Sequence, residues 1–90
     1  MLHVVKAEYI ADYRIKVSFN DGVTAFADFR ETIQKDVRPI IRNLLDLNLF
    51  RDFKVQANTI TWSNGVDFAP EYIKSISVEW FYDERTAFWI

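Results

Sequence analysis

The sequence predicts an α+β domain: an antiparallel sheet of about five strands, a meander plus a second hairpin, with short helices packed on one face. Three observations predict it. Apolar and polar residues alternate with a period of two in several short segments, which is typical of half-buried strands. Two tight-turn signals, Asn20-Asp21-Gly22 and Ser63-Asn64-Gly65, separate such segments. Residues 30–52 instead show the spacing of a helix.

The first three strands are predicted from the first turn and its flanks. Apolar residues alternate with polar ones over residues 13–19 before the turn and over residues 23–29 after it. Each of these strands therefore has one buried face, and the two form a hairpin. A further alternating segment over about residues 3–10 is linked to them by Ala11-Asp12 and completes a three-stranded meander.

A helix is expected next, followed by a short second turn through Leu49, Phe50 and Phe53. Asp36 is expected to cap it ahead of Pro39, because proline suits the first turn of a helix. The apolar residues that recur at helical spacing are Val37, Ile40, Ile41, Leu44, Leu45 and Leu47.

In the second half of the chain, residues 53–57 alternate between apolar and polar and residues 59–62 are rich in strand-forming types, which predicts a second hairpin. A short helix is expected from Pro70 to about Ser75, since Glu71 near its start and Lys74 near its end suit the helix dipole. Alternation returns after residue 76 and favours a strand.

Length and composition predict a single domain over residues 1–90, with a core at 1–75 and an aromatic C-terminal extension at 76–90. Half of the residues are hydrophobic and 27% are charged, which is typical of a globular protein. The chain has no cysteine, and this excludes disulfides and favours a cytoplasmic location. The net charge of -2 excludes a uniformly basic surface for nucleic acid. No apolar run approaches the roughly 18 residues of a membrane span, so no membrane partner is expected.

We expect no enzymatic activity, because no catalytic constellation is present in the sequence. His3 is the only histidine, and none of the four serines lies in a Gly-x-Ser-x-Gly motif. Two isolated glycines cannot form a phosphate-binding or dinucleotide-binding loop. We expect no cofactor and no metal site for the same reason.

The most concentrated basic feature is formed by Arg38, Arg42 and Arg51. Arg38 and Arg42 are four positions apart, which places them on one face of a helix. They are candidate ligands for phosphate or for an acidic partner. The simpler interpretation is a solvated helix face, partly neutralised by Asp46. Weak nucleic-acid or anionic-ligand binding through this arginine face is the alternative function.

The C-terminal extension is the candidate partner-binding segment. It is denser in aromatic residues than a core of this size readily absorbs, and Trp and Tyr are enriched at interface hot spots. Either these rings complete the core, or they form a homodimer or hetero-partner interface, for example by edge-strand pairing. The candidate residues are Trp80, Phe81, Tyr82, Phe88 and Trp89.

Several segments resemble one family of small bacterial proteins, the domain of unknown function 2442. They are residues 2–9, residues 13–22, the pair Asp28-Phe29, LFRDF at 49–53 and ITWSNGVDFAPEY at 60–72. The resemblance covers about residues 1–75 and implies a small α+β domain with an antiparallel sheet. It implies no established activity. Members are often encoded beside another small protein, an arrangement that resembles a toxin–antitoxin pair. The resemblance therefore implies a non-enzymatic interaction module, an antitoxin-like partner of a neighbouring gene product.

Overall fold

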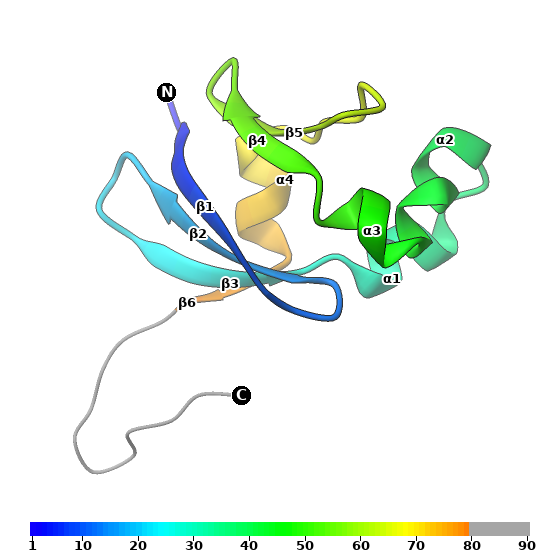
Figure 1. The fold of residues 1–90 in the computed structure, drawn as a ribbon. Helices are drawn as coiled ribbons and strands as arrows, with labels where there is room; N and C mark the ends of the chain where they lie inside the picture. Colours follow the sequence, from blue (N-terminus) through cyan, green and yellow to red (C-terminus); the bar gives the residue numbers. More distant parts are fainter. Residues whose placement is uncertain (80–90) are drawn as a thin grey trace, which may run out of the picture.

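The computed structural model describes residues 1–79, which form two antiparallel sheets and several short helices (Figure 1). The predicted α+β class is confirmed. The larger sheet has the strand order β1-β2-β3-β6, and the smaller one pairs β4 with β5. The second hairpin thus forms a sheet of its own. The strands are β1 (Val4–Ala11), β2 (Arg14–Phe19), β3 (Thr24–Asp28), β4 (Phe53–Gln56), β5 (Thr59–Trp62) and β6 (Ser77–Glu79).

The predicted meander is confirmed, and its register sorts the side chains onto two faces. Ile15 of β2 lies opposite Tyr9 of β1 and Ala27 of β3. Ile15 and Ala27 are fully buried, so this row belongs to the inner face of the sheet. At the turn between β2 and β3, Gly22 has a φ of +88°, a conformation that glycine adopts without steric cost.

The predicted helix after β3 is wrong in its extent. Three short helices and one 3₁₀ turn lie where one helix and a short second turn were expected, because loop residues interrupt the helix at 36–38 and again at Asp46. The apolar residues assigned to the helix began at Val37, so the first of the three, α1, was not identified as a separate helix. The helices are α1 (Arg30–Lys35), α2 (Pro39–Arg42), α3 (Leu47–Phe50) and α4 (Pro70–Ser75), with a 3₁₀ turn, η1, at Asn43–Leu45. The helix predicted at 70–75 is confirmed as α4.

The expected cap of this region is also wrong. Arg38, not Asp36, occupies the N-cap position of α2, and it makes no side-chain cap hydrogen bond. The side chain that does cap a helix here is Asp46, whose carboxylate accepts a hydrogen bond from the Asn48 backbone N–H at the start of α3.

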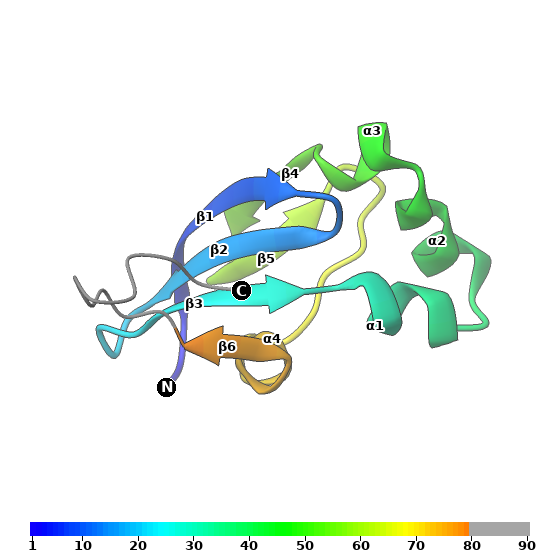
Figure 2. The same ribbon diagram turned by 90° about the horizontal axis from the view of Figure 1, so that it is seen from below.

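The core lies between the inner face of the large sheet and a second layer. Figures 1 and 2 show the β4–β5 hairpin and α4 against this face, with α1, α2 and α3 gathered at one end. Trp62 of β5 is the centre of an aromatic cluster, with ring centroids 5.4 Å from Phe29, 5.7 Å from Phe50 and 5.8 Å from Phe68. This cluster fixes the helical end of the molecule to the sheet. None of the helices in residues 1–79 combines the length and the apolarity that a bilayer crossing requires.

Candidate functional site

Strand β6 forms one edge of the large sheet. It pairs only with β3 among the described strands, and Val78 lies opposite Phe26. The Val78 side chain is 66% exposed, although it belongs to a strand of the main sheet. An exposed apolar side chain on an open edge strand is a typical site of protein association. This edge is the first component of the candidate site.

The aromatic residues predicted to bind a partner, Trp80, Phe81, Tyr82, Phe88 and Trp89, lie outside the described residues.

The outer face of the large sheet continues from the edge strand. One row across the four strands consists of Glu8, Lys16, Phe26 and Val78. Phe26 is only 7% exposed, yet it does not belong to the inner core cluster. The polar end of the row borders a hollow of about 120 Å³. The outer face is therefore apolar at the β6 edge and charged towards β1.

The opposite edge of the sheet is formed by β1 and differs in construction. Its register with β2 shifts between Val4 and Lys6 and again between Tyr9 and Ala11, as at β-bulges. The β4–β5 hairpin reaches this edge, where the Asn58 carbonyl accepts a hydrogen bond of 2.9 Å from the Val4 N–H. Bulges and a covering hairpin are both devices that protect an edge strand from pairing.

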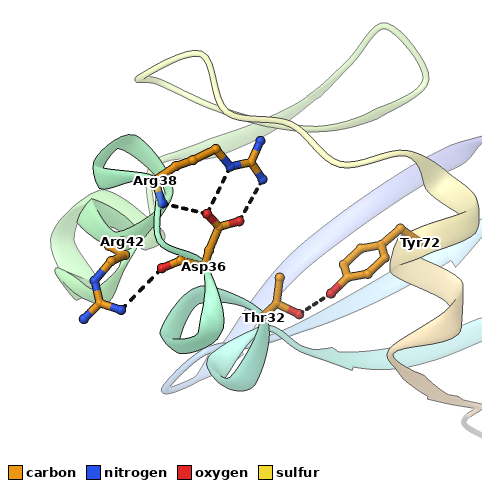
Figure 3. Close-up of polar contacts among 5 residues, drawn as sticks. All are labelled: Thr32, Asp36, Arg38, Arg42 and Tyr72. Carbon is orange, nitrogen blue, oxygen red and sulfur yellow. Dashed lines mark hydrogen bonds and ion pairs between the residues drawn. The ribbon is translucent and has the colours of Figure 1, made fainter.

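A groove of about 910 Å³ lies between α1 and α4. The hydroxyl groups of Thr32 and Tyr72 are hydrogen-bonded across it at 2.6 Å (Figure 3). Phe68 stacks on the Tyr72 ring at a centroid distance of 5.6 Å. The groove was not predicted, because Thr32 and Tyr72 are far apart in the sequence, and the family-like segment that ends at Tyr72 indicates a fold rather than a site.

Two ion pairs lie beside this groove, Glu31 with Lys35 and Asp36 with Arg38. Glu31 and Lys35 form an ion pair one helical turn apart, and their hydrogen bond lowers the pKa of Glu31 and raises that of Lys35. Arg38 donates two side-chain hydrogen bonds to the Asp36 carboxylate, at 3.0 and 2.7 Å. These bonds, helped by the Arg38 backbone N–H, lower the pKa of Asp36 to about 2. Both carboxylates are thus ionised near neutral pH, whereas a general acid needs a raised pKa.

The structure brings two of the three predicted arginines together and places the third elsewhere. Arg38 and Arg42 both contact Asp36: Arg38 binds its carboxylate, and Arg42 donates to its carbonyl oxygen at 3.4 Å and to that of Gln34 at 2.8 Å (Figure 3). Arg51 lies after α3, with its guanidinium 5.0 Å from the centre of the Tyr9 ring. Arg42 and Arg51 form no ion pair with a carboxylate of the described residues, so only Arg38 is neutralised.

A further apolar surface lies beside α2, where the sequence predicted burial. Ile41 and Leu44 are buried as expected, but Val37 is 87% exposed, and Ile40 and Leu47 are also exposed. The prediction for Val37 is wrong because residues 36–38 form a loop rather than the first turn of a helix.

The described residues contain no group of three or more metal-ligating side chains of the kind that holds an ion. The backbone of His3 is engaged with Asn20 near the start of the chain: its N–H donates to the Asn20 side-chain oxygen at 2.8 Å. Nothing in this arrangement aligns the histidine with a nucleophile.

The sequence was compared with protein families, with curated proteins and with solved structures. The family described as "Protein of unknown function (DUF2442)" matches residues 4–79, a range that includes β6. No curated protein and no solved structure gave a match.

Proposed function

Because the chain belongs to the DUF2442 family, whose function is unknown, we propose a function from its surface: a non-enzymatic module that binds a protein partner at the β6 edge. The observation that supports this most directly is strand β6, which pairs only with β3 within residues 1–79 and exposes Val78. In the sequence it is followed by a segment containing five aromatic residues. The candidate partner-binding residues are those five, Trp80, Phe81, Tyr82, Phe88 and Trp89.

Two physical reasons support protein rather than small-molecule binding. An edge strand supplies backbone N–H and C=O groups that an incoming strand satisfies with main-chain hydrogen bonds. Trp and Tyr, which occur in the sequence that follows β6, bury large areas at little entropic cost when they bind a partner, and such residues dominate binding energies at interfaces. In the α1–α4 groove, in contrast, four of the charged side chains already form the ion pairs Glu31–Lys35 and Asp36–Arg38.

The proposed partner is the small protein encoded by the neighbouring gene, and the proposed role is antitoxin-like. We further propose that the two meet in the cytoplasm. The absence of cysteine from the chain supports this location, since the cytoplasm keeps thiols reduced and proteins there need no disulfides.

Co-expression with the neighbouring gene product tests this proposal. A tagged full-length chain is purified and the partner measured by native mass spectrometry. Val78→Asp places a charge on the exposed edge, and we expect it to abolish co-purification. Val5→Asp is the matched control, because Val5 is an exposed valine of the β1 edge, 56% accessible. Equal co-purification with both variants would contradict binding at β6.

Anionic-ligand binding through the arginines is the second candidate. It is favoured by Arg42 and Arg51, which keep their charge without a described carboxylate partner. Fluorescence anisotropy with short DNA and RNA strands, measured over a range of salt concentrations, tests it. Phosphate contacts release counterions, so affinity should fall steeply with salt. Arg42→Gln and Arg51→Gln should weaken binding, whereas the double variant Asp36→Asn, Arg38→Gln, which removes both members of an ion pair and leaves the net charge unchanged, should not. Binding that ignores salt would exclude this function.

A further inference from the structure

Two turns of the described chain have the same backbone construction. One follows Phe19 at the end of β2, and the other follows Trp62 at the end of β5. In each turn a glycine N–H donates to the carbonyl of that last strand residue, at 3.1 Å for Gly22 and 2.9 Å for Gly65. The two glycines have φ values of +88° and +91°. The turns therefore differ mainly in the side chain that precedes the glycine.

That side chain is Asp21 in the first turn and Asn64 in the second. Each accepts a hydrogen bond from the backbone N–H two residues later, at 3.0 Å for Asp21 and 3.2 Å for Asn64. The second polar atom of each side chain reaches a helix. Asp21 forms an ion pair with Lys74 of α4, whereas the Asn64 Nδ2 donates to the Ile40 carbonyl of α2 at 3.1 Å. Asn64 thus connects α2 to the turn after β5.

An asparagine that precedes glycine is chemically labile, because glycine has no side chain to hinder an attack by its own backbone nitrogen. The Gly65 nitrogen attacks the Asn64 Cγ and forms a five-membered imide. The Asn64 Nδ2 leaves as ammonia, with the proton that the Gly65 nitrogen gives up. Water then cleaves one of the two imide C–N bonds and leaves aspartate or isoaspartate. The net change is an amide replaced by a carboxylate.

In the folded chain the reacting groups are held apart from this reaction. The proton that the Gly65 nitrogen must lose is donated to the Trp62 carbonyl at 2.9 Å. The Asn64 amide is fixed at both ends, by the Val66 N–H and by the Ile40 carbonyl. Its Cγ therefore turns towards the Gly65 nitrogen only after these contacts break. The contact with Ile40 breaks when α2 separates from the turn.

We propose that Asn64 is a site of spontaneous deamidation that α2 controls: the amide stays intact while it donates to Ile40 and reacts when α2 separates. Helix α2 has four residues and a single buried side chain, Ile41, and such weakly packed elements open locally. The product keeps α2 from returning, because a carboxylate only accepts hydrogen bonds and cannot bind the Ile40 carbonyl. The modification makes a reversible opening permanent.

The variant Asp21→Asn tests this control within one chain, because it places a second Asn-Gly-Val sequence in the matching turn. At position 21 the new amide faces Lys74 instead of a helix carbonyl. The full-length variant is kept in mildly alkaline buffer, and peptide mass spectrometry measures deamidation at both positions. In the folded chain, position 64 should react roughly two- to twelvefold more slowly than position 21, the effect of one additional hydrogen bond. In urea the two rates should agree. Equal rates in the folded chain, or no reaction of Asn64 in urea, overturn the proposal.

Two arginine variants of the otherwise natural chain test the role of α2 separately. Arg42 holds the end of α2 to the carbonyl oxygens of Gln34 and Asp36, so Arg42→Gln should speed the deamidation of Asn64. Arg51→Gln removes the same charge from a position after α3 and should leave the rate unchanged. Circular dichroism confirms that both variants are folded. Equal rates in both would show that α2 does not control the reaction.

The effect of the product is tested with Asn64→Asp. The Arg42 N–H donates to the Arg38 carbonyl at 3.0 Å within α2, and hydrogen exchange of this amide followed by NMR reports the opening of the helix. Exchange should be faster in Asn64→Asp than in the natural chain. In the first turn, Asp21→Asn should leave it unchanged, because that side chain contacts α4. Unchanged exchange in Asn64→Asp would show that the modification does not release α2.

Discussion

The indole Nε1–H of Trp62 donates a hydrogen bond of 2.7 Å to the carbonyl oxygen of Phe50, inside the aromatic cluster of the core. Phe50 ends α3 and Trp62 ends β5, so this bond joins the helical end of the molecule to the smaller sheet. Both side chains are buried, and water cannot replace the indole as a donor without entering the core.

Trp62→Phe should therefore destabilise the fold by more than the loss of ring volume. The Phe50 carbonyl would be left without this donor, which costs roughly 1–3 kcal/mol for a buried polar group. Urea unfolding followed by circular dichroism measures the change. Val37→Ala is the control, since that side chain is largely in solvent and its loss should cost less than about 0.5 kcal/mol. A Trp62→Phe variant as stable as this control would show that the bond contributes nothing.

The hydroxyl pair between Thr32 and Tyr72 should couple α1 to α4. A double-mutant cycle of Thr32→Val and Tyr72→Phe is expected to give a coupling free energy of about 0.5–1.5 kcal/mol, the range of a typical hydrogen bond. The same cycle with Tyr9→Phe in place of Tyr72→Phe should be additive within about 0.5 kcal/mol, because no hydrogen bond joins Thr32 to Tyr9. Additivity of both cycles would mean that the two helices are independent here.

The pKa of Asp36 should depend on Arg38. In the folded chain this pKa is about 2, against 3.8 for a free aspartate. The ionised form is therefore favoured by folding. Its stabilising effect is complete above pH 3.8 and is lost as the pH falls through about 2.

Arg38→Gln should raise the pKa of Asp36 towards 3.8, measured by NMR titration of the carboxyl carbon. Arg42→Gln is the matched control. The Arg42 guanidinium contacts the Asp36 backbone carbonyl and not its carboxylate, so the titration should change little. An unchanged pKa in Arg38→Gln would show that the backbone N–H of residue 38 is sufficient.

Substitutions in the turn between β4 and β5 should stabilise the fold. Ala57 and Asn58 both have positive φ, 53° and 67°, the pattern of a type I′ hairpin turn. Asn-Gly suits such a turn far better than Ala-Asn, so the double variant Ala57→Asn, Asn58→Gly should raise the free energy of unfolding by about 1 kcal/mol. Thermal unfolding checks this. Gly22→Ala should lower the free energy of unfolding. The added Cβ meets no neighbouring atom, but the φ of +88° is unfavourable for a residue with a side chain. A double variant no more stable than the natural chain contradicts the argument.

The strands of the meander could be predicted well because alternate residues of β2 are buried; β3 departs from this period, since Phe26 on its other face is buried as well. Ile15 and Val17 are buried and Lys16 between them is not, so burial follows the same two-residue period as the alternation of apolar and polar residues in the sequence. The helices between β3 and β4 could not be predicted in the same way. Each has four to six residues and only one of them buried, such as Ile33 in α1 and Ile41 in α2. A single buried residue produces no period.

The candidate site was predicted only where it depends on composition. The aromatic residues after residue 79 can be identified from the sequence alone. Their contribution to partner binding stays a prediction. The environment of the arginines was not predictable, because Arg42 binds backbone carbonyls and Arg51 lies on a tyrosine ring. Such contacts depend on where the chain folds back on itself, and the spacing of charges along the sequence does not reveal that.

The pairing of β3 with β6 joins segments that leave the ribosome at different times. β1, β2 and β3 are complete before any helix is synthesised, whereas β6 follows all of them. During translation the chain grows by only about 5–20 residues per second. The edge of β3 therefore stays without its β6 partner for the time in which the intervening residues are synthesised. In that interval β3 offers its Ala25–Ala27 backbone to any strand that arrives first. The β3 edge of a nascent chain therefore lacks its β6 partner until residues 77–79 have been synthesised.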